Sequence, residues 1–184
     1  MKTTKLLGLA AVALMAIACG SNPSKGGNQN VKSKSEKVEQ REERNSDSVT
    51  LPDFTQNDIS GQPVSLHAAI SQNKVTLIDF WASWCGPCRA EMPNVVSLYE
   101  TYKDKGFGII GISLDEDADS WKNAVQAMNM NWLQLSDLNG WNNEISASLG
   151  IRSIPFTIIV DSKARVLAAG LRGEELERKI EELL

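Results

Sequence analysis

Residues 75–93 read VTLIDFWASWCGPCRAEMP, and this stretch decides the fold. It opens with a nearly continuous apolar run at 75–81, which is typical of a strand buried on both faces. After a short Ala-Ser-Trp segment, CGPC at 85–88 begins a stretch whose apolar side chains recur at helical spacing, at 92, 95, 96, 99 and 102. The pattern predicts a buried strand that leads directly into a helix with two cysteines in its first turn.

A Cys-X-X-Cys pair at a helix start has a definite chemistry. Unpaired backbone N–H groups and the positive end of the helix dipole stabilise a thiolate there. In such motifs the thiol pKa falls from about 8.5 to about 7 or lower. We predict that Cys85 is exposed and attacks, and that Cys88, deeper on the same side, resolves the mixed disulfide. Gly86 and Pro87 keep the turn compact, because a proline early in a helix loses no hydrogen bond.

A structural disulfide and half of a zinc site are the alternatives for this pair. A zinc site needs about four ligands. The chain has no second cysteine pair, and its only histidine, His67, lies outside the motif, so we expect no metal. The formal net charge of −4 also gives no basic surface for nucleic acid.

Residues 1–18 have the layout of an export signal. Lys2 and Lys5 give a positive start, and the apolar stretch at 6–18 is too short for a comfortable membrane span. The sequence AIAC at 16–19 resembles the bacterial lipobox, so we expect a lipoprotein-type signal peptide and acylation of Cys19. Acylation with more than one chain would anchor the protein stably. An ordinary cleaved signal and an uncleaved anchor are the alternatives.

Residues 19–48 are predicted to be a disordered tether, and residues 49–184 a single folded domain. The tether has no aromatic residue and is rich in Ser, Asn, Gly, Lys and Glu. Such a segment buries too little apolar surface to offset the entropy lost on ordering.

Within 49–184, apolar patterns and turn signals alternate in a regular order. A turn-rich stretch at 58–63 predicts a hairpin, and Pro93 predicts a kink or a local break in the cysteine helix. The remaining pattern predicts an α/β fold, a three-layer α/β/α sandwich with a mixed central sheet. Its expected elements are strands at 107–114, 132–135, 154–160 and 166–169, a helix after a solvated acidic loop at 115–119, a short helix over 141–149, and a C-terminal helix.

The strand, the CGPC helix, an Ile-Pro strand start at 154–155 and the terminal β-β-α order together resemble thioredoxin. With the export signal, the hairpin and a helix-strand insert between 115 and 135, the chain resembles the membrane-anchored TlpA/ResA-like thiol–disulfide oxidoreductases over nearly all of 49–184. The resemblance implies a thioredoxin-like domain whose redox-active Cys85–Cys88 disulfide works without a further cofactor.

Two acidic residues are candidates for proton transfer. Asp79 interrupts the apolar strand, where loss of water should raise its pKa. The resemblance implies that Asp79 relays a proton to or from the resolving thiol. Glu91 matches the acidic residue that ResA-like proteins place near their cysteines. A merely tolerated polar residue at Asp79 and a solvated first-turn carboxylate at Glu91 are the alternatives, and the sequence does not decide which of the two works.

The resemblance also implies a client-binding surface around the disulfide. Ile154-Pro155 matches the family's cis-proline, which leaves the neighbouring backbone free to pair with a client strand; an ordinary trans proline is the alternative. Residues expected at this surface are Trp84, Gly86, Pro87, Ile154 and Pro155. Trp81 is expected in the core, and Trp121, Trp132 and Trp141 are expected to pack inside the insert.

The resemblance implies an extracytoplasmic enzyme: a monomeric reductant of client disulfides, lipid-anchored in a bacterial cell envelope and facing the periplasm. Its expected electron donor is a membrane-embedded thiol reductase, and apocytochrome c is a candidate client, which would give it a role in cytochrome c maturation. A disulfide oxidase or isomerase is the first alternative. A thiol peroxidase is a weaker one, because the chain has no Thr-x-x-Cys peroxidatic motif.

Overall fold

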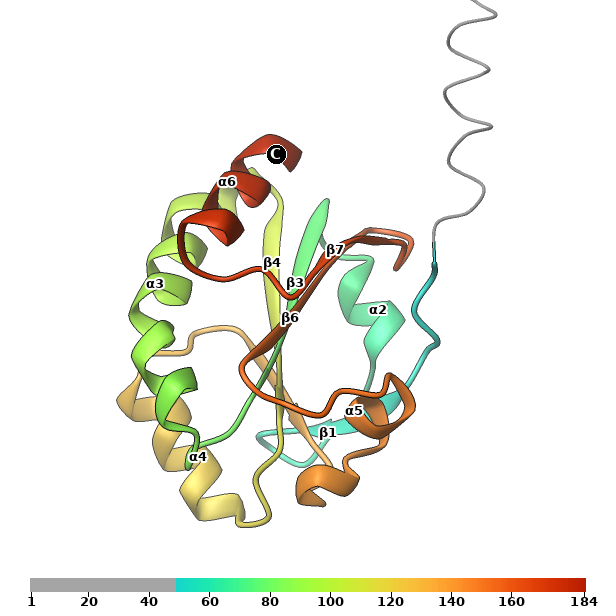
Figure 1. Cartoon of the computed structure of the whole chain (residues 1–184). Coiled ribbons are helices and arrows are strands. Elements are labelled where there is room, and N and C mark those ends of the chain that lie inside the picture. Colours follow the sequence, from blue (N-terminus) through green and yellow to red (C-terminus); the bar gives the residue numbers. More distant parts are fainter. Residues whose placement is uncertain (1–48) are drawn as a thin grey trace, which may run out of the picture. The chain divides into compact units, whose positions relative to one another are not determined.

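The computed structural model describes residues 49–184, so the predicted signal peptide, the Cys19 lipidation and the tether lie outside the described residues. The domain is a three-layer sandwich around one seven-stranded mixed sheet with the strand order β2-β1-β5-β4-β3-β6-β7. Helices α3, α4 and α6 cover one face of the sheet, and α2 and α5 cover the other (Figure 1). This arrangement confirms the predicted fold class.

The strands are β1 (Thr55–Asp58), β2 (Pro63–Ser65), β3 (Val75–Trp81), β4 (Phe107–Ser113), β5 (Leu133–Ser136), β6 (Phe156–Asp161) and β7 (Val166–Ala169). The helices are α2 (Leu66–Ile70), α3 (Gly86–Tyr102), α4 (Ala118–Ala127), α5 (Glu144–Ser148) and α6 (Gly173–Leu183), with short 3₁₀ turns η1 (Lys103–Lys105) and η2 (Gly140–Asn142).

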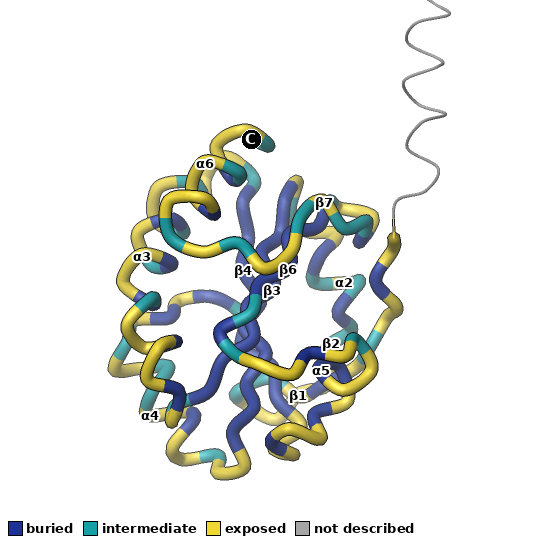
Figure 2. The backbone as a smooth tube through the Cα atoms, in the orientation of Figure 1, coloured by how far each residue is buried: buried dark blue, intermediate teal, exposed yellow. Residues whose placement is uncertain are grey.

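Strand β3 is the centre of the sheet. It pairs in parallel with β4 and antiparallel with β6, and every residue of β3 and β4 is buried. Figure 2 shows this buried centre beneath exposed helix surfaces. The apolar run therefore became a strand covered on both faces, as its sequence predicted.

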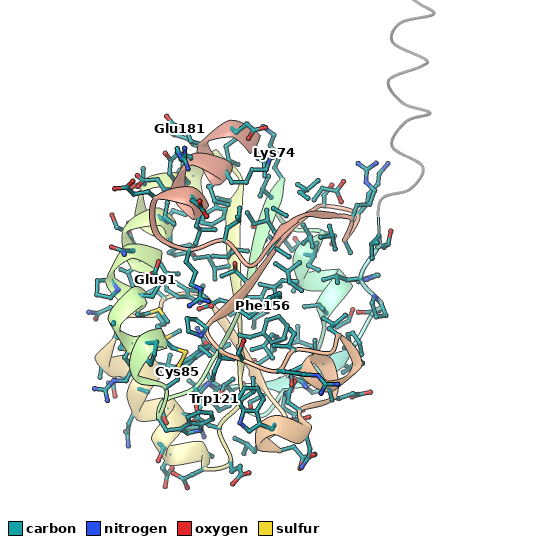
Figure 3. All side chains as sticks on the ribbon, viewed as in Figure 1. Lys74, Cys85, Glu91, Trp121, Phe156 and Glu181 are labelled. Atoms are coloured by element: carbon teal, nitrogen blue, oxygen red, sulfur yellow. A yellow bond between two sulfur atoms is a disulfide. The ribbon has the colours of Figure 1, made fainter. Side chains whose placement is uncertain are left out.

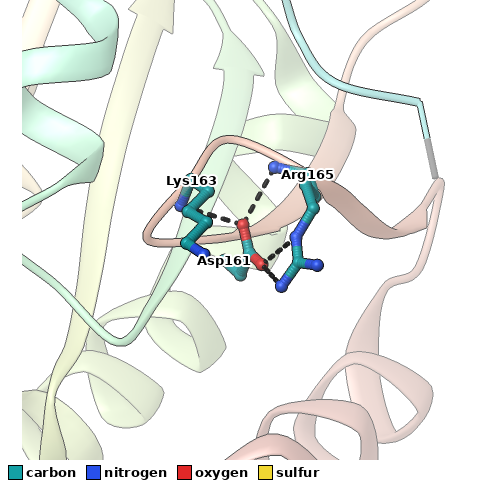
Figure 4. A network of polar contacts seen from close by, with 3 residues as sticks. All are labelled: Asp161, Lys163 and Arg165. Carbon is teal, nitrogen blue, oxygen red and sulfur yellow. Dashed lines mark hydrogen bonds and ion pairs between the residues drawn. The ribbon is translucent and has the colours of Figure 1, made fainter. Parts of the chain in front are cut away.

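The predicted hairpin is formed by β1 and β2, and β1 also pairs antiparallel with β5, so that the hairpin extends the sheet. At the opposite edge, Asp161 closes the turn between β6 and β7 (Figure 4). Its carboxylate accepts hydrogen bonds from the backbone N–H groups of Lys163 and Arg165 and pairs with the Arg165 side chain. Burial raises the pKa of Asp161, but these bonds outweigh burial and hold the pKa below its usual value.

Helix α3 begins directly after Cys85 and runs through Pro93 without interruption. The predicted local break is therefore absent. A proline removes one backbone hydrogen bond, whereas Met92 and Val95 on either side of it are buried against the sheet and keep the helix in place. The 3₁₀ turn η1, which follows α3, ends at Gly106. The φ of Gly106 is 89°, a left-handed conformation that glycine adopts without strain.

Candidate active site

Cys85 and Cys88 form a disulfide at the start of α3, with a Cα–Cα distance of 5.3 Å (Figure 3). Cys85 is the N-cap residue, and its sulfur accepts a hydrogen bond from the backbone N–H of Cys88 at 3.2 Å. Cys85 is 5% exposed and Cys88 1% exposed, so the prediction of an exposed Cys85 is wrong for this oxidised form. The bond to Cys88 draws the Cys85 sulfur against the first helical turn, although Cys85 is still the more accessible of the two.

A compact loop joins β3 to the disulfide. The backbone N–H of Cys85 donates to the carbonyl of Ala82 at 3.1 Å. The Asp115 carboxylate accepts bonds from the Ser83 backbone N–H (3.0 Å) and hydroxyl (2.6 Å) and from the Ser113 hydroxyl (2.7 Å). Asp115 therefore ties the loop before the cysteines to the end of β4.

The sequence predicted a solvated loop at 115–119, and for Asp115 this is wrong, because it is 1% exposed. The available signal was its position: Asp115 follows a strand buried on both faces almost directly, so its side chain starts inside the domain. The neighbouring Glu116 and Asp117 are exposed.

Asp79 lies in the middle of β3 and is 3% exposed. Loss of water on burial, reinforced by the negative charge of Glu91, raises the pKa of Asp79 to about 7. The predicted direction of this pKa shift is confirmed. A carboxyl with such a pKa exchanges protons readily near neutral pH.

Glu91 has a role that neither sequence interpretation included. Its Oε1 accepts a hydrogen bond from the backbone N–H of Gly173, the first residue of α6, at 2.8 Å. The residue before α6, Arg172, makes no side-chain cap of its own. Glu91 therefore caps a second helix from across the helical layer, while its charge acts on Asp79.

The Ile154–Pro155 peptide bond is cis, as the resemblance implied. Pro155 is buried and Ile154 is partly buried. Because Phe156 pairs with Phe80, Pro155 lies beside the end of β3 from which the cysteine loop departs. The cis-proline and the disulfide are thus brought to the same end of the sheet.

One of the five tryptophans, Trp141, is not buried as the sequence predicted. Trp81 is fully buried and donates from Nε1 to Gln134 Oε1 at 3.1 Å. Trp121 and Trp132 are packed inside, as expected, but Trp141 is 46% exposed, so its predicted packing role is wrong. The stretch 141–149 does not form one helix: Asn143, whose ψ of 126° is not helical, separates η2 from α5, and this break leaves Trp141 exposed beside Trp84.

Within residues 49–184, no three His, Cys, Asp or Glu side chains come together as a set that could hold a metal ion. No helix in this part of the chain is both long and apolar enough to cross a membrane.

The chain is similar in sequence to known proteins. The model of the Redoxin family matches residues 46–184. The thiol-disulfide oxidoreductase ResA of Bacillus thuringiensis subsp. konkukian (strain 97-27) is 30% identical over 144 residues, which cover 78% of this chain and 80% of ResA. The thiol:disulfide interchange protein HelX of Rhodobacter capsulatus is 32% identical over 120 residues, 64% of this chain and 65% of HelX.

Solved structures of thiol–disulfide oxidoreductases are similar to this domain. A thiol-disulfide oxidoreductase from Bacteroides fragilis superimposes with a TM-score of 0.69 at 32% sequence identity, covering 74% of this chain and 100% of that one. A thiol:disulfide interchange protein from Bacteroides sp. gives a TM-score of 0.66 at 32% identity, over 73% and 88% of the two chains. The chain belongs to the Redoxin family and is a thioredoxin-like thiol–disulfide oxidoreductase similar to ResA.

Proposed function

We propose that this enzyme is a reductant of client disulfides outside the cytoplasm. The observation that carries its disulfide-exchange activity is the hydrogen bond from the Cys88 backbone N–H to the Cys85 sulfur at the start of α3. In the reduced protein the same donor and the helix dipole stabilise a Cys85 thiolate. A stabilised thiolate is the form that attacks a disulfide.

The exchange has two steps. The Cys85 thiolate attacks one client sulfur, forms a mixed disulfide and releases the other client sulfur as a thiolate, which takes up a proton. Cys88 then gives its proton to ionised Asp79, and the Cys88 thiolate attacks the Cys85 sulfur and releases the second client thiolate. The client gains two electrons, and the enzyme is left with the Cys85–Cys88 disulfide that the structure contains. A membrane-embedded thiol reductase would restore the dithiol.

We also propose that the N-terminal residues anchor the enzyme to a membrane. A lipoprotein signal at 1–18, acylation of Cys19 and a tether at 19–48 would hold a monomeric domain at the periplasmic side of a bacterial membrane. The resemblance to ResA-like proteins supports apocytochrome c as a client. A Cys19→Ala variant tests the anchor: it should move from the membrane fraction to the soluble fraction, and continued membrane association would contradict lipidation.

The reduction potential tests the direction of exchange. Gly-Pro between the cysteines and Ile before Pro155 resemble the reducing members, so the potential should lie near that of thioredoxin, about −270 mV. Equilibration with glutathione or thioredoxin measures it. A potential near about −120 mV, as in strong oxidants, would instead favour a disulfide oxidase. Rapid consumption of hydrogen peroxide would favour the peroxidase alternative.

A further inference from the structure

Trp84 and Trp141 form an exposed aromatic pair beside the reactive cysteine. Their ring centroids are 6.2 Å apart with planes tilted by 54°, and the residues are 55% and 46% exposed. Trp84 immediately precedes Cys85, whereas Trp141 comes from η2, after β5. Any polypeptide joined to Cys85 in a mixed disulfide lies next to Trp84. Exposed aromatic side chains in such a place mark an interaction surface.

The loop after β4 holds both tryptophans in place. Asp115 binds Ser83, the residue before Trp84. The next residue, Glu116, lies against Gly140, the residue before Trp141: a Cβ atom on Gly140 would be only 2.4 Å from Glu116 Oε1. Gly140 also has a φ of 58°, which favours glycine. The aromatic pair is therefore pre-organised rather than a loose contact between two mobile side chains.

The charge of this part of the domain favours a basic partner. Residues 115–149 contain five exposed acidic residues and one exposed basic residue. None of these acidic side chains takes part in the ion pairs formed within residues 49–184. Glu116 is exposed beside Trp141. A Lys or Arg side chain would gain a cation–π contact with the rings and a charge-assisted bond to the carboxylate.

We propose that Trp84, Trp141 and Glu116 form a docking subsite for a basic side chain of the client polypeptide, close in sequence to its reactive cysteine. The subsite rests on the proposed function, since its occupant is the client that forms the mixed disulfide with Cys85. It adds a preference among clients that the dithiol alone does not supply.

Two disulfide-bonded peptides of equal length test the subsite, one with Lys and one with Glu two residues from the cysteine. The reduced protein should reduce the Lys peptide with a kcat/KM about threefold higher, as expected for one exposed cation–π contact. Trp141→Ala should bring the two rates together, and Glu116→Gln should reduce the preference, because it removes the carboxylate but leaves the rings. Leu167→Ala, which shortens an exposed side chain on the edge strand β7, should keep the preference.

The outcomes separate the two proposals. Equal rates for both peptides with the unchanged protein, or a preference that survives Trp141→Ala, would overturn the subsite and leave the reductase function standing. Failure to reduce either peptide would overturn the function itself. Because exposed charges are screened by salt, the preference should also shrink at high ionic strength.

Gln134 in β5 is a buried polar residue, 3% exposed. Its Oε1 accepts the N–H of Trp81, which fixes the orientation of the amide. Its Nε2 is buried and has no hydrogen-bond partner among the described residues. A buried donor without a partner costs free energy, so its position needs an explanation.

The sheet register places this donor near Asp79. Asp79 pairs with Gly111, and Gly111 pairs with Gln134, so all three face the same side of the sheet. A Cβ atom on Gly111 would be 2.2 Å from Gln134 Oε1 and 2.8 Å from Nε2. The amide therefore occupies the space over Gly111, between its own strand and Asp79.

The geometry points to Gln134 as a positioning residue for Asp79: its Nε2, which makes no direct hydrogen bond to the carboxyl group in this structure, donates to the ionised carboxylate across Gly111 through one buried water. The charged group that acts on Asp79 from α3 is Glu91, which opposes ionisation. Gln134 would act in the opposite direction and favour the ionised form that accepts the Cys88 proton.

The carboxyl ¹³C shift of Asp79 tests this role in the oxidised protein, where the thiols do not titrate. Gln134→Met keeps a side chain of similar length but removes the donor, so the Asp79 midpoint should rise by about one pH unit. Gln56→Met is the matched control. The side-chain amide of Gln56 is also buried and without a hydrogen-bond partner among the described residues. Because β5 and β4 separate β1 from β3, this variant should not move the Asp79 midpoint. An unchanged midpoint in Gln134→Met, or equal shifts in both variants, would overturn the assignment.

Discussion

Glu91 on the active-site helix caps the C-terminal helix: its Oε1 accepts a hydrogen bond from the backbone N–H of Gly173 at 2.8 Å. The same carboxylate raises the pKa of Asp79. One side chain therefore joins the stability of α6 to the protonation of the buried acid beneath the disulfide helix.

These two effects of Glu91 can be separated by substitution. Glu91→Gln keeps a carbonyl oxygen for Gly173 but removes the charge, so the Asp79 pKa should fall while stability changes little. Glu91→Ala removes both, and it should lower the Asp79 pKa and also cost about 1 kcal/mol of unfolding free energy. Denaturant unfolding and carboxyl titration measure the two quantities. Equal stability losses in both variants would contradict the capping role.

Asp79 should make stability depend on pH. Its folded pKa, about 7, lies above the ordinary value of 3.8, so the neutral form is favoured in the folded state. Stability should then fall as pH rises from about 4 to about 7 and change no further above that, by about 4 kcal/mol in all. Asp79→Asn should abolish this fall and be more stable than the parent at pH 8.

The same variant should slow disulfide exchange, because Asn cannot accept the Cys88 proton. Denaturation of the oxidised protein at several pH values and single-turnover reduction of insulin measure the two effects. Unchanged exchange rates would mean that Glu91 or water, rather than Asp79, accepts the Cys88 proton.

Asp115 should be required for the geometry of the cysteine loop. Asp115→Ala leaves the Ser83 N–H and hydroxyl without their acceptor and should cost about 2–3 kcal/mol of unfolding free energy. Asp117→Ala is a suitable comparison, because Asp117 is exposed and caps only α4, so a loss of about 1 kcal/mol is expected. An Asp115→Ala protein no less stable than Asp117→Ala would argue against the role of Asp115.

The two cysteines should fail in different ways. Cys85→Ser should abolish reduction of insulin disulfides, because the nucleophile is gone. Cys88→Ser should accumulate mixed disulfides with clients, since the resolving thiol is missing. Non-reducing gels followed by mass spectrometry detect these adducts, and the double variant should form none. Trapping by Cys85→Ser instead would reverse the assigned order of attack.

The sequence alone determined the features that depend on neighbouring residues. The apolar run at 75–81 became β3, CGPC became the start of α3, and the alternating order gave the mixed sheet. The raised pKa of Asp79 was also predictable, because a carboxyl inside a doubly buried strand loses water whatever packs on it.

Only the tertiary structure decided the contacts between distant parts of the chain. Glu91 and Gly173 are 82 residues apart, and Ser83 and Asp115 are 32 apart. Trp141 was expected inside because its spacing fitted a helix that the structure breaks at Asn143. Local periodicity records which side of an element is apolar, but a polar side chain finds its partner only when the sheet has set which elements lie side by side.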